Sequence, residues 1–141
     1  MSANYFIDTN IFIYQLEALD GSKSVTADGL IRKGIETKDA CISFQVVQEC
    51  LNTALRKAEI PLSVDEMRTY IDNVLEPLFR VPASIPLYKR ALGIQARYGY
   101  SFYDSLIVAA ALDAGCERIY SEDMQSGQRI EGLKIENPFE S

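Results

Sequence analysis

The sequence lacks histidine and tryptophan altogether, and its 141 residues include only three cysteines. Without histidine, carboxylate oxygens are the only obvious metal ligands in this chain, and they suit a hard divalent cation rather than zinc. The cysteines, Cys41, Cys50 and Cys116, are odd in number, lack CxxC spacing and lie in apolar segments. We therefore expect three reduced thiols in the core.

The chain also has no apolar run long enough to cross a membrane. Its opening segment, MSANYFIDTN, contains Asp8 and no basic flank, unlike a signal peptide, so we expect a cytoplasmic protein. Basic residues are scarce, because 14 Lys and Arg against 20 Asp and Glu leave a net charge of −6. This balance argues against a broad basic surface that holds nucleic acid by counterion release.

The length and the composition, 48% hydrophobic and 24% charged, suit a single domain over residues 1–141. Apolar periodicity and breaker residues predict strands that alternate with helices. This alternation favours an α/β fold, a three-layer α/β/α sandwich around a mostly parallel sheet of about four to five short strands. The predicted strands are residues 3–7, 40–43, 81–84, 118–120 and 133–135, and the predicted helices are 11–16, 25–37, 44–58, 64–80, 86–97 and 102–114.

Several residues are placed to begin or end these helices. Side-chain oxygens before a helix accept hydrogen bonds from its first amides, whereas proline and glycine stop a helix. The predicted signals are caps at Ser43 and Ser101, a capping box of Ser63 with Glu66, stops at Pro61 and Gly99, and a break over residues 21–24.

Four carboxylates lie where a strand ends or a helix begins in this prediction. They are Asp8 after the first strand, Glu49 in the early turns of the third helix, Asp104 in the first turn of the last helix, and Asp123 after the fourth strand. Because a crevice forms at the carboxyl edge of a parallel sheet, we expect these acids to converge there. Acids packed together need a cation, and oxygen ligands alone match Mg²⁺ or Mn²⁺.

Each acid taken alone also has an ordinary structural explanation. Asp8 and Asp104 stand at positions where aspartate commonly caps a helix, Glu49 fits a solvated helix face, and Asp123 lies in an acidic turn. The joint pattern is more informative, since a metal site needs several carboxylates from separate elements.

Four segments carry these acids in order: FIDTNIFIY, SFQVVQE, FYDSLIVAAAL and IYSEDM. From end to end they resemble the motifs of the PIN domain, the small metal-dependent ribonuclease fold typical of toxins in type II bacterial toxin–antitoxin modules. The resemblance implies that Asp8, Glu49, Asp104 and Asp123 form the acidic quartet. It further implies that Asn10 supports the first aspartate, and it places Ser121 where threonine is more usual. Glu122 is a second candidate beside Asp123, and the spacing from Ser121 favours Asp123.

The function that this resemblance implies is RNA hydrolysis at a site holding Mg²⁺ or Mn²⁺, which activates a water and shields charge on the phosphate. The sequence does not assign which acid accepts the proton of the water; Asp104 and Glu49 are both candidates. The alternative is a PIN-like protein that has lost catalysis and only binds nucleic acid or a partner.

Two other enzyme or binding classes fit less well. A phosphatase with Asp8 as the covalent nucleophile would have a second aspartate two residues later, where the chain has Asn10. A phospho-receiver would have paired acids after the first strand and a late lysine, and the late segment RIYSEDM contains no lysine.

Partners and substrate contacts are less visible in the sequence. The resemblance and the apolar helices 44–58 and 64–80 lead us to expect a homodimer and a small cognate antitoxin whose C-terminal segment covers the acidic crevice. Five basic residues on predicted helices either face solvent or contact RNA phosphates: Arg56, Lys57, Lys89, Arg90 and Arg97. Four aromatic residues before Asp104 either pack in the core or stack on RNA bases: Tyr98, Tyr100, Phe102 and Tyr103.

Overall fold

A six-stranded sheet runs through the centre of the computed structural model, which describes residues 3–17, 21–57, 60 and 62–140. The strand order is β3-β2-β1-β4-β6-β5, and every neighbouring pair is parallel except β5 with β6. The strands are β1 (Tyr5–Ile7), β2 (Ala40–Ser43), β3 (Phe79–Val81), β4 (Arg118–Tyr120), β5 (Arg129–Ile130) and β6 (Leu133–Glu136). The predicted α/β class with a mostly parallel sheet is confirmed.

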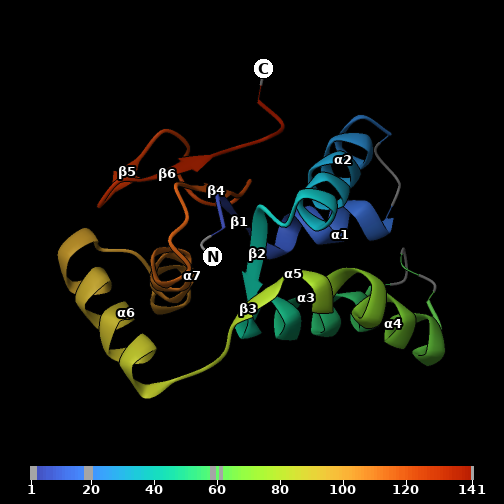
Figure 1. Ribbon diagram of the computed structural model, residues 1–141, viewed down its shortest axis with the longest axis horizontal. Coiled ribbons are helices and arrows are strands. Elements are labelled where there is room, and N and C mark those ends of the chain that lie inside the picture. Colours follow the sequence, from blue (N-terminus) through green and yellow to red (C-terminus); the bar gives the residue numbers. More distant parts are fainter. Residues whose placement is uncertain (1–2, 18–20, 58–59, 61, 141) are drawn as a thin grey trace.

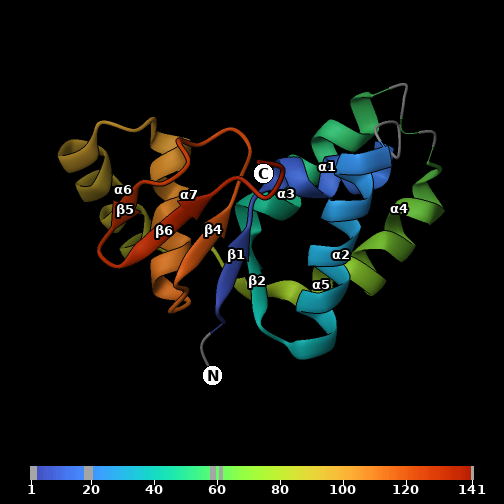
Figure 2. The same ribbon diagram turned by 90° about the horizontal axis from the view of Figure 1, so that it is seen from above.

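Helices flank this sheet on two sides (Figures 1 and 2). One side carries α1 and α2, the other carries the packed pair α6 and α7, and α3 and α5 lie along β2. The helices are α1 (Thr9–Glu17), α2 (Gly21–Thr37), α3 (Phe44–Arg56), α4 (Val64–Tyr70), the π-helical turn η1 (Ile71–Leu75), α5 (Glu76–Leu78), α6 (Ile85–Tyr98) and α7 (Phe102–Asp113). No helix in the described ranges is long and apolar enough to span a membrane.

The central strands and α7 are apolar on every side because they are buried in the core. Phe6, Ile7 and Ile42 on β1 and β2 are fully buried, as expected for parallel strands covered on both faces. Helix α7 is buried continuously from Ser105 to Ala111, and its small alanines let it lie close against the sheet. The two central strands and α7 therefore form a rigid base from which the polar residues at their ends project.

Several element boundaries differ from the prediction. The break expected over residues 21–24 is instead the first turn of α2, where Lys23 contacts Glu122 and Tyr14 and so ties the turn to the rest of the fold. The strand expected at 81–84 is β3, which ends at Val81 because Pro82 has no amide hydrogen for the ladder. Helix α3 is described to Arg56; the predicted positions Ala58 and Pro61 lie outside the described residues.

Strand β5 was not predicted at all. It pairs with β6 through a tight hairpin in which Glu131 and Gly132 both adopt positive φ, 50° and 89°. Positive φ at both central residues is the type I′ geometry, which usually selects Asn-Gly or Asp-Gly. Because the first position is Glu131, the sequence lacks the usual signal for this turn.

Most of the capping predictions hold. Ser63 and Glu66 form the capping box, Ser101 accepts a hydrogen bond from the Asp104 amide, and Gly99 ends α6 at a φ of 78°. The Ser43 prediction is wrong in part, because Ser43 occupies the position before α3 but its hydroxyl makes no capping hydrogen bond. Its side chain is buried at the end of β2, and its hydroxyl has no hydrogen-bond partner among the described residues.

Candidate active site

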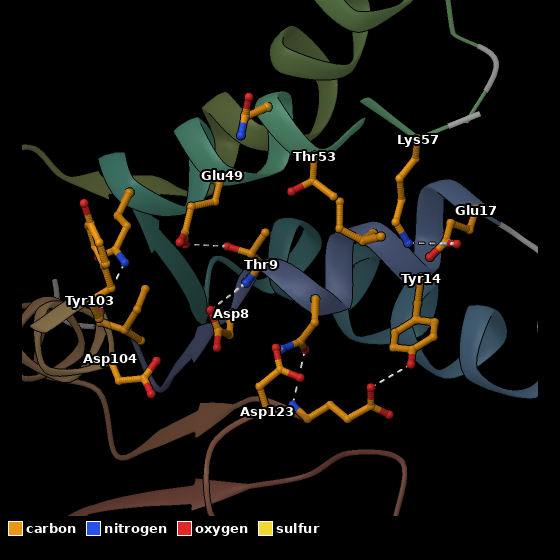
Figure 3. Close-up of a pocket in the computed structure, with 16 residues that line it drawn as sticks. Asp8, Thr9, Tyr14, Glu17, Glu49, Thr53, Lys57, Tyr103, Asp104 and Asp123 are labelled. Carbon is orange, nitrogen blue, oxygen red and sulfur yellow. Dashed lines mark hydrogen bonds and ion pairs between the residues drawn. The ribbon is translucent and has the colours of Figure 1, made fainter. Parts of the chain in front are cut away.

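Asp8, Glu49, Asp104 and Asp123 all line one pocket of about 510 Å³ (Figure 3). They come from separate elements, since Asp8 follows β1, Glu49 lies on α3, Asp104 lies in the first turn of α7, and Asp123 follows β4. The pocket opens at the carboxyl end of the parallel strands, where β1 continues into α1 and β2 into α3. The structure thus brings the predicted acids to one place.

Asp8 is held firmly at the end of β1. Its amide donates to the Tyr120 carbonyl at 3.0 Å, which extends the pairing of β1 with β4 by one residue. Its carboxylate accepts one hydrogen bond from the Thr9 amide at 2.7 Å and one from the Ser121 hydroxyl at 2.8 Å. Only 8% of Asp8 is exposed, so its carboxylate has one fixed orientation.

The electrostatics of Asp8 are those of an acid in an acidic, partly dry site. The pKa of Asp8 is raised to about 6. Burial is the main cause, the charges of Glu49 and Asp104 act in the same direction, and the hydrogen bonds from Ser121 and Thr9 act against it. Burial also raises the pKa of Asp104, with Asp123 contributing in the same direction. At both residues the negative charge of a neighbouring acid therefore adds to the effect of burial on the pKa.

Asn10 occupies a different place from the one expected. Its side-chain amide donates to Asp123 Oδ2 at 3.1 Å, and its carbonyl oxygen accepts from the Glu122 amide at 3.2 Å. The side-chain support of Asp8 comes instead from Ser121, whose hydroxyl also accepts from the Met124 amide. Asn10 therefore orients Asp123, and Ser121 orients Asp8.

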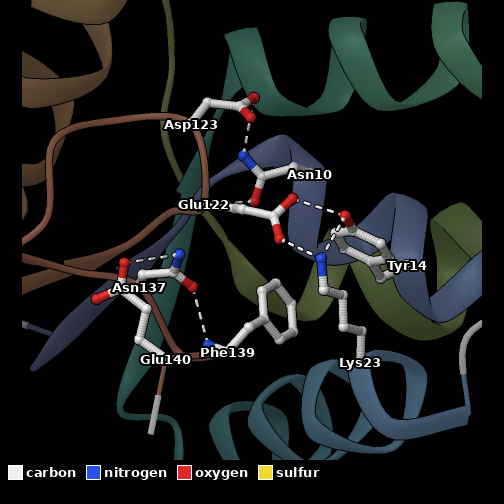
Figure 4. A network of polar contacts seen from close by, with 8 residues as sticks. All are labelled: Asn10, Tyr14, Lys23, Glu122, Asp123, Asn137, Phe139 and Glu140. Atoms are coloured by element: carbon white, nitrogen blue, oxygen red, sulfur yellow. Dashed lines mark hydrogen bonds and ion pairs between the residues drawn. The ribbon is translucent and has the colours of Figure 1, made fainter.

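Glu122 and Asp123 point in different directions (Figure 4). The Glu122 carboxylate accepts a hydrogen bond from the Tyr14 hydroxyl at 2.6 Å and pairs with Lys23 Nζ at 2.7 Å, so it is engaged with α1 and α2. The ring of Phe139 packs against Tyr14 at 5.0 Å and lies under Lys23, which closes this cluster from the C-terminal side. Asp123 is left facing the other acids.

Glu49 is joined to the site by α1. Its Oε1 accepts a hydrogen bond from the Thr9 hydroxyl at 3.1 Å, and the amide of the same Thr9 donates to Asp8. Gln45, one turn earlier on α3, donates to the Tyr103 carbonyl at 3.1 Å, while its own buried side-chain oxygen has no protein partner. Gln45 thereby links α3 to the start of α7 and leaves an acceptor in the pocket lining.

The donor set fits a hard divalent cation in its chemistry, since it consists of oxygen atoms from four acids that share one pocket. As the side chains stand, however, no three of the His, Cys, Asp or Glu residues described are grouped closely enough to hold an ion. Three of the four carboxylates are instead hydrogen-bonded to neighbours, Glu49 to Thr9, Asp8 to Ser121 and Asp123 to Asn10. Closing a coordination sphere requires the carboxylates to move toward one another.

The far end of the pocket contains an ion pair that the sequence did not single out. Lys57 Nζ lies 3.3 Å from Glu17 Oε2, and Asn52 and Thr53 line the same wall. Of the five basic residues considered from the sequence, Lys57 alone is among the pocket-lining residues, and Arg90 pairs with Asp113 elsewhere. Of the four aromatic residues, Tyr103 lines the pocket, whereas the rings of Tyr98 and Tyr100 stack on each other.

Comparison with known proteins agrees with this architecture. The family profile described as the PIN domain matches residues 5–128. No curated protein sequence matches the chain at a significant level.

Solved structures provide further similar folds. A toxin–antitoxin complex from Klebsiella pneumoniae has a chain that is 20% identical, with a TM-score of 0.65 and coverage of 98% of this chain and 100% of its own. The DNA-bound VapBC of Salmonella typhimurium aligns at 18% identity and a TM-score of 0.66, covering 96% and 98%. The toxin VapC20 of Mycobacterium tuberculosis, which cleaves the sarcin–ricin loop, aligns at 20% identity and a TM-score of 0.62, covering 85% and 90%.

Proposed function

Since this chain belongs to the PIN-domain family, whose members are typically nucleases, we propose that it is an endoribonuclease that hydrolyses RNA with Mg²⁺ or Mn²⁺. The observation that carries the proposal is the arrangement of Asp8, Glu49, Asp104 and Asp123 around one pocket at the carboxyl end of the sheet. The similarity to VapC toxins in fold supports a toxin of a toxin–antitoxin pair as the biological role.

In this proposal the same four acids would hold the cation. When bound, Mg²⁺ or Mn²⁺ lowers the pKa of a water and offsets charge on the non-bridging phosphate oxygens. Asp8 is oriented by Ser121 and Thr9, and Asp123 by Asn10, and both line the pocket that would hold the cation. Asp104 and Glu49, on the opposite walls of the pocket, are the two acids left to accept a proton from an attacking water.

A cleavage assay on mixed RNA tests this function. We expect the wild-type protein to cut RNA with Mn²⁺ and not with a chelator, and we expect Asp8→Asn and Asp104→Asn each to lower the rate by at least about 100-fold. Circular dichroism checks that both variants stay folded. Glu122→Gln is the matched control, because Glu122 is engaged with Tyr14 and Lys23. Wild-type rates in either aspartate variant would remove that residue from the site.

The second candidate is a PIN domain that binds RNA or a partner without cutting. It is favoured by one observation, namely that no three of the described acids are grouped tightly enough to hold an ion as they stand. The same assay separates the two functions. RNA binding without cleavage at any Mn²⁺ concentration identifies the inactive form.

The proposed assembly is a homodimer that also accepts an antitoxin. An apolar groove between α3, η1 and β3 offers a surface for contacts between copies; it is lined by Phe44, Val47, Ile71, Leu75 and Phe79. The antitoxin would cover the acidic pocket with its C-terminal segment and place a basic side chain among the carboxylates. Light scattering measures the dimer directly, and a mass near the 15.8 kDa of one chain at all concentrations contradicts it.

A further inference from the structure

The pocket is strongly acidic, and its positive charge comes from one place. Lys57 is the one cationic side chain among the described residues that line it. The lining acids are Asp8, Glu17, Glu49, Asp104, Glu122 and Asp123. An RNA strand is a row of negative charges, so a strand that enters this pocket meets repulsion everywhere except near Lys57 and a bound cation.

Lys57 stands on the same wall as Glu49. Glu49, Thr53 and Lys57 follow one another at intervals of four residues along α3 and its end, so they share one face of the helix. Figure 3 shows Lys57 at the end of the pocket opposite Asp104, with Thr53 between Lys57 and Glu49. At a rise of about 1.5 Å per residue, Lys57 is about 12 Å along the helix from Glu49.

This separation determines what Lys57 is able to contact. In its pair with Glu17, the Lys57 ammonium lies at the end of the pocket away from Asp104, with Thr53 between it and Glu49 (Figure 3). In this position it does not face a phosphate that reacts among the four acids. It is well placed for a phosphate farther along the same strand.

The Glu17 pair keeps Lys57 in place without burying it. The Lys57 side chain is 41% exposed and Glu17 is 16% exposed, and their contact joins α3 to α1. Partly exposed pairs of this kind contribute little to stability, so exchanging Glu17 for a phosphate costs little. Thr53 and Asn52 supply further hydrogen-bond donors on the same wall.

We propose that Lys57 binds a backbone phosphate of the RNA strand that flanks the reacting one, and that Glu17 competes with RNA for this lysine. The inference rests on the proposed ribonuclease function and adds the substrate-binding residue to it. A phosphate contact positions the strand and carries no base preference. Lys57 therefore sets the register of the strand relative to Asp8 and Asp104.

The test compares Lys57→Met with Arg56→Met. Arg56 is the neighbouring cation at the end of α3, is exposed, and does not line the pocket, so it matches Lys57 in charge and position. Binding is measured by fluorescence anisotropy with a labelled single-stranded RNA, in an Asp8→Asn background that prevents cleavage. KM and kcat are measured on the same RNA with Mn²⁺ in the otherwise wild-type protein.

We expect Lys57→Met to raise the dissociation constant and KM roughly three- to tenfold with kcat nearly unchanged, and to lower the slope of log K against log salt by about 0.7. Arg56→Met should leave all of these at their wild-type values, and Glu17→Gln should tighten binding. Equal effects of Lys57→Met and Arg56→Met overturn the inference while the ribonuclease function stands. If the wild-type protein neither binds nor cuts RNA with Mn²⁺, both proposals fail together.

Discussion

Asp8 is the residue at which burial and function conflict most directly. Its carboxylate is buried beside other acids and its pKa is raised to about 6, whereas an unfolded aspartate titrates near about 3.9. The folded state therefore holds the Asp8 proton more tightly than the unfolded chain does. By linkage, this group makes the metal-free protein less stable as the pH rises from about 4 to about 6, and the loss persists at higher pH.

Removing the Asp8 charge should therefore stabilise the protein in the presence of a chelator. We expect the free energy of unfolding of Asp8→Asn to exceed the wild-type value by up to about 3 kcal/mol at pH 7.5, and by less at pH 5, because each unit of pKa shift corresponds to about 1.4 kcal/mol. Urea denaturation at the two pH values measures this gap. Asp65→Asn, which removes a carboxylate with a 90% exposed side chain, is the control. A gap that does not grow with pH contradicts the electrostatic account of Asp8.

At the residue scale, the sequence predicted which acids meet but only part of how they are held. The sequence predicted the positions of Asp8 and Asp123 from the ends of their strands. In the structure the side chains of Glu122 and Asp123 have different partners, Tyr14 for Glu122 and Asn10 for Asp123. The contacts that make this separation join Glu122 to Tyr14 and Lys23 over 108 and 99 positions of the chain. Pairings over such separations depend on how the helices cross and leave no local pattern in the sequence.

At the scale of elements, the approach of α2 to the sheet depends on a glycine. Gly34 lies where a side chain would meet Ala40 Cβ at 2.4 Å and the Tyr5 hydroxyl at 3.0 Å. The same hydroxyl donates to the Leu30 carbonyl of α2 at 3.0 Å. Helix α2 is therefore fitted closely against β1 and β2 at this point.

Gly34→Ala and Gly29→Ala form a matched pair that tests this contact. Alanine is favoured over glycine in a helix by about 1 kcal/mol, and at Gly29 a new methyl group meets nothing within 4 Å. We expect Gly29→Ala to stabilise the protein by up to about 1 kcal/mol. Gly34→Ala should destabilise it by about 1 to 2 kcal/mol, because overpacking outweighs the propensity gain. Equal stabilisation by both changes in urea melts would show that α2 does not press on the sheet.

Elements were predictable from the sequence where local chemistry and packing agree. The capping box of Ser63 with Glu66, the Ser101 cap and the Gly99 stop lie where the sequence predicted them. The predictions failed where one residue breaks the usual pattern, as Glu131 does in the hairpin before β6. The π-helical turn η1 just before Pro77 is a second case, since the periodicity of residues 64–80 predicts one helix with at most a kink at Pro77 in its last turn.

For the whole molecule, the net charge of −6 opposes the binding of RNA, which is also negatively charged. An acidic protein gains little from general attraction to phosphates, so substrate contacts have to be local. The four proposed ligands and Lys57 lie in one pocket and, under the proposed function, would provide such contacts once a cation offsets the acids. The sequence indicated that the acidic balance opposes RNA binding, and under the proposed function the cation and Lys57 offset it inside the pocket.

Under the proposed function, four acids from distant segments form one divalent-cation site, and Mn²⁺ binding to the metal-stripped protein measures whether they do. Calorimetric titration should give one saturable binding event for the wild type. Asp8→Asn, Glu49→Gln, Asp104→Asn and Asp123→Asn should each weaken it by about tenfold or more, while Glu122→Gln should bind like the wild type. If the wild type takes up no Mn²⁺, or if all five variants bind it equally well, the four acids do not form one cation site.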